Sequence, residues 1–261
     1  MKEIHTFYVP EADSATELPA EEAAHCLRVL RLQAGDEIRL TDGNGSFYRA
    51  EIAETTGKRC SYRVLEACPH GREWQGHLHL AVAPTKNMDR MEWLAEKATE
   101  IGFDELTFLD CRYSERKVVK TERIDKILVA AMKQSHKAFK PRLNGMEDFK
   151  KFVSRPFSGQ KFIAHCYEGE KPLLKDIFRK GEDALVLIGP EGDFSEEEVK
   201  KAMENGFTPI SLVGPEGDFS LDEVRLALAN GFRSVSLGRS RLRTETAALV
   251  AVHLMHIRHA I

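Results

Sequence analysis

The sequence lacks the features of a membrane, secreted or zinc-binding protein. No apolar run approaches the roughly 20 residues that a membrane span needs, and the first residues contain no apolar segment typical of a secretion signal. The five cysteines are odd in number and never form a Cys-x-x-Cys pair, which argues against a disulfide framework and against a zinc site. We therefore expect a cytoplasmic protein with reduced thiols, no metal ion and no membrane partner.

The sequence also lacks the net positive charge that favours nucleic-acid binding, since its formal charge is -3. Its basic residues are nevertheless concentrated, with ten Lys or Arg and only three Asp or Glu between Arg112 and Arg142. Such a run forms either a solvated helix face or a surface that follows phosphates. Both interpretations stay open from composition alone.

Residues 1–72 are expected to form a small β-barrel-like domain. The apolar spacing predicts a helix over Pro19–Leu32, and turn-separated strands are predicted at Glu37–Leu40, Phe47–Glu54 and Ser61–Ala67. Glycines in the turns between them supply the positive φ angles of tight hairpins. The polar stretch Pro69–Gly76 has little to bury, so we place the domain boundary there.

From residue 73 to residue 261 strands and helices alternate, which is typical of an α/β fold with a parallel sheet. Ala184–Ile188 is wholly apolar, as in a strand buried on both faces. Further strands are expected at His77–Ala83, Glu105–Leu109 and Lys161–Cys166, and helices at Met88–Ile101, Lys120–Phe139, Leu173–Arg179 and Ala247–Ile257.

A tandem repeat follows the apolar strand. Gly189–Val213 and Gly214–Gly238 both begin GPEGDFS, and 15 of their 25 aligned positions are identical. Each copy predicts a loop, a helix with a Ser-x-x-Glu capping box, a glycine stop and a strand. Exposing the apolar side chains of a spare copy would cost roughly 1.5–3 kcal/mol for each large residue, so we expect both copies to be packed.

Two segments indicate a ligand site. The GPEG turn lies between a strand and a helix, where open α/β sheets bind ligands, but no Gly-Lys-Ser/Thr follows it, which excludes a phosphate-binding P-loop. The segment LGRSRLRTETAA at residues 237–248 has three alternating arginines before Thr244, a candidate N-cap. Solvated loop arginines are the alternative interpretation of this segment.

Together these motifs resemble the SPOUT superfamily of knotted methyltransferases, and specifically the bacterial small-subunit ribosomal RNA uridine-N3 methyltransferases of the RsmE type. The resemblance rests on IGPEG at residues 188–192 and LRTETAA at residues 242–248. It extends along nearly the whole chain through HCLRVLR (25–31), DG (42–43), KNMDRME (86–92), KATEIG (97–102), ER (115–116) and AMKQS (131–135).

The resemblance implies an α/β trefoil-knotted SPOUT methyltransferase domain with a parallel sheet, preceded by a PUA-like β-barrel that binds RNA. It also implies a homodimer that binds ribosomal RNA and the cofactor S-adenosylmethionine. Three loops would hold the cofactor, with the residues Ala164, His165, Cys166, Ile188, Gly189, Pro190, Gly192, Val213, Gly214, Pro215, Glu216, Gly217, Leu237, Gly238, Leu242, Arg243 and Thr244.

For catalysis we expect Arg243 to stabilise negative charge on a uracil carbonyl, with Glu245 orienting it. Arg28 and Arg31, at i and i+3 on one predicted helix face, are candidates for binding RNA phosphates. The matching motifs add Lys86, Arg90, Arg116 and Gln134 as RNA-contacting residues.

The family pattern has one GPEG element, whereas this chain has two. Either copy can line the cofactor site, and we favour the second because its spacing to Leu242 matches the family's. Two rival functions stay open: a non-catalytic RNA-binding protein whose cofactor pocket the duplication has altered, and a transfer RNA ribose 2′-O methyltransferase.

Overall fold

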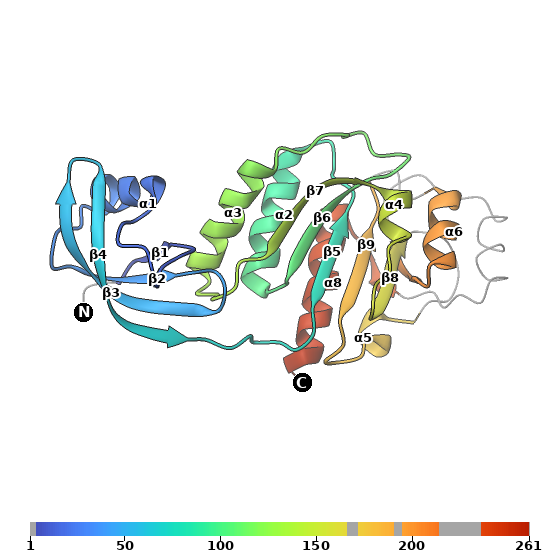
Figure 1. The fold of residues 1–261 in the computed structure, drawn as a ribbon. Coiled ribbons are helices and arrows are strands. Elements are labelled where there is room, and N and C mark those ends of the chain that lie inside the picture. The colour runs from blue at the N-terminus through green and yellow to red at the C-terminus, as the bar shows by residue number, and fades with distance from the viewer. Residues whose placement is uncertain (1–3, 166–171, 191–194, 214–235, 261) are drawn as a thin grey trace. The chain divides into compact units, whose positions relative to one another are not determined.

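The computed structural model in Figure 1 describes residues 4–165, 172–190, 195–213 and 236–260. The chain divides into two compact units, Met1–Glu73 with Val129–Lys140 and Trp74–Leu128 with Pro141–Ile261. Helix α3 (Thr121–Gln134) runs from the second unit into the first. The N-terminal unit therefore includes the last turns of a helix that the sequence pattern placed beyond residue 73.

The N-terminal unit is built on a four-stranded sheet in the order β1-β2-β3-β4. Strand β1 runs parallel to β2, while β2, β3 and β4 form an antiparallel meander. The three predicted strands are confirmed, and β1 was not predicted. The bounds are Thr6–Tyr8 for β1, Glu37–Thr41 for β2, Ser46–Thr56 for β3 and Arg59–Pro69 for β4.

The predicted hairpin glycines adopt the left-handed conformation. Gly43, Gly45 and Gly57 have φ angles of 70°, 107° and 62°. A Cβ atom on Gly45 would lie 2.6 Å from the Phe139 ring, so this position requires glycine for space as well as for its backbone angle. The prediction from the turn sequence is confirmed at these positions.

The helix predicted over Pro19–Leu32 is shorter than expected. It consists of α1 (Ala20–Ala24) followed by a π-helical turn, His25–Val29. Arg31 then turns to a φ of 54°, and the Leu32 amide donates to the Cys26 carbonyl at 3.1 Å. This bond closes the helix end and leaves Arg31 outside the helix, so the expectation that Arg28 and Arg31 share a helix face was wrong.

The second unit contains a seven-stranded sheet in the order β11-β10-β8-β9-β5-β6-β7. Every pair of neighbours is parallel, which confirms the predicted α/β class. The strands are β5 (Leu78–Val82), β6 (Glu105–Asp110), β7 (Arg142–Asp148), β8 (Gln160–His165), β9 (Ala184–Ile188), β10 (Thr208–Val213) and β11 (Ser236–Arg241).

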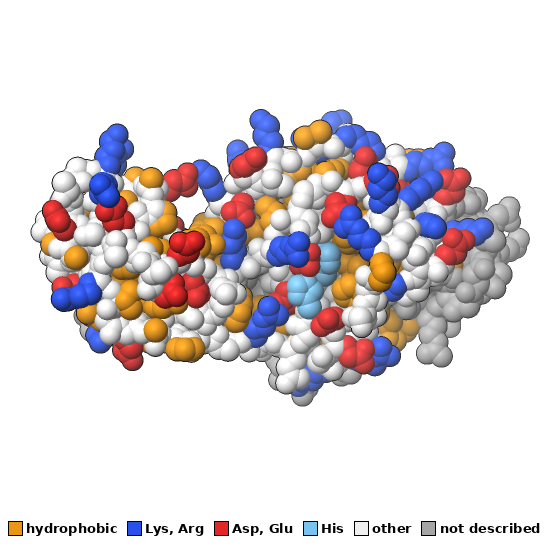
Figure 2. Space-filling view, in the orientation of Figure 1, with side chains coloured by type: hydrophobic (Ala, Val, Ile, Leu, Met, Phe, Trp, Pro, Cys, Tyr) orange, Lys and Arg blue, Asp and Glu red, His pale blue; other side chains and the backbone are white. Residues whose placement is uncertain are grey.

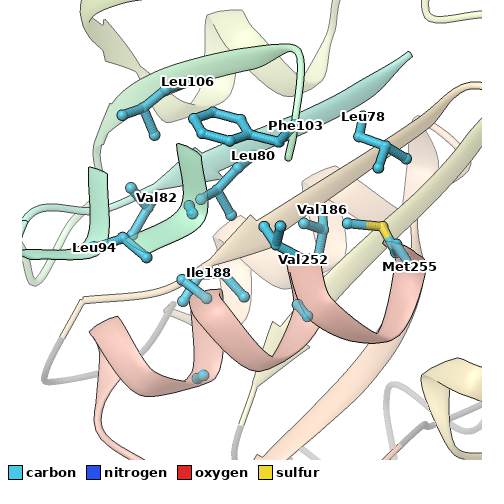
Figure 3. Close-up of a cluster of buried hydrophobic side chains, with 14 of the residues drawn as sticks. Leu78, Leu80, Val82, Leu94, Phe103, Leu106, Val186, Ile188, Val252 and Met255 are labelled. Carbon is cyan, nitrogen blue, oxygen red and sulfur yellow. The ribbon is translucent and has the colours of Figure 1, made fainter. Parts of the chain in front are cut away.

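Helices cover both faces of this sheet. One face packs against α2 (Met88–Ile101), α5 (Leu174–Ile177), α8 (Thr244–Ala260) and the start of α3. Figure 3 shows side chains of β5 and β9 pointing toward Val252 and Met255 of α8. The opposite face packs against α4 (Phe149–Val153) and α6 (Glu196–Glu204).

The described part of the first repeat copy, residues 189–190 and 195–213, folds as its sequence predicts. The Ser195 side chain and the Glu198 carboxylate form the reciprocal capping box of α6, and Gly206 follows the helix at a φ of 81°. Val199 and Phe207 are buried in the core, so this copy is packed as expected. The matching Ser220, Glu223 and Gly231 of the second copy lie outside the described residues.

Other element bounds differ from the predictions. Helix α3 ends at Gln134, before His136 turns to a φ of 54°, and α5 has only four residues. Helix α8 begins at Thr244, so this residue is the first helical residue instead of the N-cap. Strand β7 and helix α4 were not predicted.

Two global features concern the part of the chain that the structure describes. Within it, no helix is long and apolar enough to cross a membrane. Cys26, Cys60, Cys68 and Cys111 are free thiols there, and Cys166 lies outside it.

Candidate active site

The carboxyl ends of four neighbouring strands meet at one edge of the sheet. Ala164 of β8 and Ile188 of β9 are register partners there, and each is 1% exposed. Val213 at the end of β10 pairs with Arg241 at the end of β11. Ala164, Ile188 and Val213, which the sequence analysis assigned to cofactor loops, therefore lie at one edge of the sheet.

The two repeat copies start on either side of β8. The first copy follows β9 and the second follows β10, and both of these strands pair with β8. Gly189 and Pro190 are buried directly after β9. Cys166, Gly192, Gly214, Pro215, Glu216 and Gly217 lie outside the described residues, and the described part of His165 is its backbone in β8.

The last predicted cofactor segment is partly strand. Strand β11 continues to Arg241, so Leu237 and Gly238 lie within it instead of in the loop that was expected. Leu242 then packs against the main core, and the Arg243 carbonyl accepts a hydrogen bond from the Ala247 amide at 2.8 Å. This bond belongs to the first turn of α8 and fixes the position of Arg243.

A cleft of about 530 Å³ opens between the start of α2 and the start of α8. The start of α2 is held by the Asn87 side chain, which accepts from the Asp89 amide at 3.0 Å. The lining residues are Asp89, Arg90, Trp93, Leu242, Arg243, Glu245 and Thr246. The cleft thus brings together both predicted catalytic residues and one predicted RNA contact.

Glu245 is the buried charge of this cleft. Its residue is 7% exposed, and its Oε1 atom lies 3.9 Å from Nε of Arg90. Its Oε2 atom is buried and has no hydrogen-bond partner within the described ranges. Burying an unpaired polar oxygen costs about 1–3 kcal/mol, and more when it is charged, so such an atom is typical of a ligand site.

The other predicted RNA contacts lie in both units. Arg116 donates to the Lys86 carbonyl at 2.6 Å, and the Lys86 ammonium lies 3.1 Å from the Glu115 carboxylate. In the N-terminal unit, Arg28, Arg31 and Gln134 are exposed. Each unit therefore presents its own set of candidate contacts.

Acidic partners neutralise much of the basic run. Lys133 pairs with Glu22 at 2.6 Å, Arg123 with Glu92 at 2.6 Å, and Lys117 with Asp110 at 2.5 Å. On the face drawn in Figure 2, basic and acidic side chains are interspersed. The run consequently favours the interpretation as a paired, solvated surface.

Sequence reasoning missed a polar cluster on the face of the sheet that packs against α4. Glu105 accepts from His77 Nε2 at 2.8 Å and from Asn144 Nδ2 at 2.6 Å. His79 Nε2 lies 2.8 Å from the Thr107 hydroxyl, which Asn144 also contacts at 2.8 Å. The alternation of His77 and His79 on a strand was the only sequence signal.

Burial and the neighbouring polar groups shift the pKa values of this cluster. The hydrogen bond from His77 lowers the pKa of Glu105 to about 2, and the same bond raises the pKa of His77. Burial lowers the pKa of His79 to about 4, so this imidazole is neutral at pH 7. The cluster is internally satisfied and therefore structural.

A second cleft of about 380 Å³ lies beyond the ends of β6 and β7. The Arg112 amide donates to the Glu198 carboxylate at 2.6 Å, and that carboxylate also completes the α6 capping box. Burial raises the pKa of the Cys111 thiol in this cleft well above its usual value, so the thiol stays protonated and unreactive. Among the residues that the structure describes, no group of three or more His, Cys, Asp or Glu could hold a metal ion.

Comparison with known families matches both units. A model described as an RNA methyltransferase domain matches residues 72–213 and 211–256, and one described as an RNA methyltransferase PUA domain matches residues 18–65. The two methyltransferase segments meet at residues 211–213, where the first repeat copy ends, so each segment contains one copy.

Individual proteins are similar over nearly the full length. A probable rRNA methyltransferase from Porphyromonas gingivalis is 39% identical, with 98% of this chain and 99% of that chain covered and a TM-score of 0.81. A ribosomal RNA small subunit methyltransferase E from Neisseria gonorrhoeae, bound to S-adenosyl methionine, is 25% identical, with 98% of both chains covered and a TM-score of 0.78. The Ribosomal RNA small subunit methyltransferase E of Rickettsia conorii is 28% identical over 92% of this chain and 88% of its own.

Proposed function

Since this chain belongs to the RNA methyltransferase family and is an S-adenosylmethionine-dependent enzyme, we propose that it methylates N3 of a uridine in small-subunit ribosomal RNA. The names of the relatives support ribosomal RNA of the small subunit as the substrate. The observation that carries the proposal is the cleft at the start of α8, where Arg243 and Glu245 lie one and three residues after Leu242, which we assign to the cofactor.

The cofactor would be held at the carboxyl edge of the sheet by the residues assigned above. Buried Ala164 and Ile188, side by side on neighbouring strands, fit the apolar part of such a ligand, and Leu242 adds an apolar wall. When bound, S-adenosylmethionine supplies a methyl group on a sulfonium sulfur, which keeps the bonding electron pair as the methyl group leaves.

Arg243 is the residue that stabilises the nucleobase during the reaction. Uracil N3 carries a proton, which must pass to water before N3 can form its bond to the methyl carbon. The loss of this proton leaves negative charge that the ring shares with its two carbonyl oxygens. The exposed guanidinium of Arg243 lines the cleft from the last position before α8. From there it can donate hydrogen bonds to one of these oxygens.

Glu245 has a charged neighbour that the sequence did not indicate. We expect it to orient Arg243, and in the described part of the chain it also forms an ion pair with Arg90 of α2. We infer that this ion pair also brings Arg90 close to the base that is methylated.

The N-terminal unit contributes RNA affinity in this proposal. Exposed Arg28 and Arg31 bind phosphates, and Lys86 and Arg116 contact the RNA from the methyltransferase unit. The enzyme acts as a homodimer in the cytoplasm with a trefoil knot at its C-terminus, as the family resemblance implies.

The second repeat copy is the one that we assign to the cofactor. It follows β10, and the first follows β9, so the starts of both copies are neighbours of β8. Replacing Gly217 by Trp is expected to abolish S-adenosylmethionine binding in calorimetry, while Gly192→Trp leaves it measurable. The opposite pattern would assign the cofactor to the first copy.

The target atom is tested by mapping. Small-subunit RNA from cells that lack this protein is incubated with the purified chain and S-adenosylmethionine, then digested and analysed by mass spectrometry. We expect N3-methyluridine at one position. A methyl group on a ribose 2′ oxygen, or on transfer RNA only, would contradict the proposal.

A further inference from the structure

Trp93 is an exposed aromatic side chain in a charged cleft. The chain has two tryptophans, and their environments differ. Trp74 is 7% exposed and its indole N–H donates to Asp104 at 2.9 Å, whereas Trp93 is 42% exposed and lines the cleft beside Arg90 and Arg243. Aromatic faces next to arginines are the usual means by which proteins hold unstacked bases.

Glu245 supplies the complementary polar feature. Its side chain is 9% exposed, it lines the same cleft, and its buried Oε2 atom has no hydrogen-bond donor among the residues that the structure describes. The 3.9 Å separation between its Oε1 atom and Arg90 is longer than a hydrogen bond. A ligand with an N–H group would satisfy this carboxylate.

We propose that this cleft is the base pocket of the enzyme, in which Trp93 stacks on the target uracil and Glu245 accepts the hydrogen bond of its N3–H. The inference rests on the proposed function, because it names the residues that recognise the atom to be methylated. Uracil fits this arrangement since it presents N3–H between two carbonyl acceptors, and Arg243 can donate to one of them.

The arrangement also gives specificity. Cytosine has no proton on N3, and the product N3-methyluridine has lost it, so neither can donate to Glu245. A site built around a hydrogen bond strongly rejects analogues that lack it, because its own polar atom is left unpaired. The pocket therefore favours uridine over cytidine and substrate over product.

A second copy of the chain is the competing occupant of this cleft. Charged residues are depleted at the centre of interfaces between proteins. Here Asp89, Arg90, Arg243 and Glu245 all line the cleft around one tryptophan. This composition favours a polar, planar ligand over an apolar partner surface.

Tryptophan fluorescence of the full-length protein tests the pocket directly. Uridine, cytidine and N3-methyluridine are titrated at millimolar concentration in the presence of S-adenosylhomocysteine. We expect uridine to quench the emission, the other two nucleosides to quench it several-fold less, and the uridine signal to vanish in Trp93→Phe, where only buried Trp74 remains. Equal quenching by all three nucleosides, or a signal that persists in Trp93→Phe, would overturn the proposal.

Kinetics of the variants separate stacking from folding. Trp93→Leu is expected to raise the KM for RNA about tenfold, while Trp93→Phe, which keeps an aromatic face, stays near the wild-type KM. Glu245→Ala should lose the preference for uridine over N3-methyluridine while calorimetry still detects S-adenosylmethionine. An unchanged KM in Trp93→Leu, or a change of oligomeric state in sedimentation without a change in KM, would assign the cleft to a subunit contact and refute the base pocket.

The mapping and fluorescence experiments can fail independently, so they test the target atom and the base pocket separately. If mapping finds the methyl group at another atom while uridine still quenches Trp93 selectively, the target atom is wrong and the pocket stands. If mapping finds N3-methyluridine but Trp93 does not respond, the function stands and the pocket is wrong.

Discussion

Two glutamates of the same domain sit in opposite surroundings. Glu105, on the face of the sheet that packs against α4, is bound by His77 and Asn144. Glu245, in the cleft at the start of α8, is more buried, but one of its oxygens has no hydrogen-bond partner in the described ranges. A satisfied buried carboxylate stabilises the fold, whereas an unsatisfied one is a stability cost that a ligand can offset.

The comparison distinguishes a site whose polar atoms are satisfied by protein neighbours from one that leaves a polar atom available. The pKa of Glu105 falls to about 2 and that of His79 to about 4, yet the groups responsible are all protein neighbours. A shifted pKa therefore indicates function only when the site also leaves polar atoms available. Of the two glutamates, only Glu245 leaves an oxygen without a hydrogen-bond partner in the described ranges.

The largest expected effect is on the rate of methyl transfer, when Arg243 in the cleft at the start of α8 is replaced. Replacing Arg243 by Ala removes the donor that we propose acts on the developing charge, and deletions of such donors lower kcat by about 10²–10³. Methyl transfer to RNA is measured with radiolabelled S-adenosylmethionine. Arg155→Ala, an exposed arginine of the same domain that lines neither cleft, serves as the matched control. Activity of Arg243→Ala close to that of the control would refute the assignment.

Lowering the pH should reduce the free energy of unfolding through the polar cluster of His77, His79 and Glu105. The folded pKa of His79 is about 4, below its usual 6.5, so its contribution is present above pH 6.5 and is lost as the pH falls toward 4. This loss amounts to about 3 kcal/mol for a buried group. Glu105, with its pKa lowered to about 2, acts in the same direction between pH 4.5 and 2, and the raised pKa of His77 opposes it.

Urea unfolding at several pH values measures this dependence, and His79→Asn is the informative variant. Its free energy of unfolding should change less between pH 6.5 and pH 4 than that of the wild type. Equal slopes for the two proteins would show that His79 does not carry the acid sensitivity.

Removing the satisfied glutamate should destabilise the fold. Glu105→Ala leaves His77 and Asn144 without their acceptor, which is expected to cost about 2 kcal/mol in the free energy of unfolding. The rate of methyl transfer by the folded fraction should stay unchanged. A large loss of kcat with normal stability would mean that the cluster belongs to the active site.

The smallest expected effect is at Arg31 in the N-terminal unit. Its φ of 54° is a conformation that costs a non-glycine residue about 1 kcal/mol, so Arg31→Gly should stabilise the protein by roughly that amount. The same change should weaken RNA binding and reduce the slope of its salt dependence by about 1. Arg28→Ala is the control, because Arg28 is exposed but does not have a positive φ angle, so its replacement relieves no backbone strain. An unchanged salt slope in both variants would exclude these arginines as phosphate contacts.

Local patterns predicted the elements whose sequences carry strong signals. The apolar run of β9 and the helix α2, with its stop at Gly102, were predicted with their correct bounds. Strand β7 was missed because it is an edge strand whose residues are exposed or half-buried, so it has no apolar run. The π-helical turn at His25–Val29 was missed because one turn of wider winding leaves the apolar spacing almost unchanged.

The site was predictable only in part. Motifs in one segment identified Arg243 and Glu245, but the contact between Glu245 and Arg90 depends on the packing of α8 against α2. Trp93 looked like any other residue of an amphipathic helix, because its exposure is set by the same tertiary packing. Sequence patterns do not encode which faces of distant helices meet.

The most direct test of the comparison is to make Glu245→Leu and to measure both its free energy of unfolding and its rate of methyl transfer. Because leucine removes a buried, incompletely paired carboxylate and with it the acceptor for uracil N3–H, we predict stability within about 1 kcal/mol of the wild type or above it, together with a loss of methyl transfer. A variant that is destabilised as much as Glu105→Ala, yet transfers methyl groups at the wild-type rate, would contradict it.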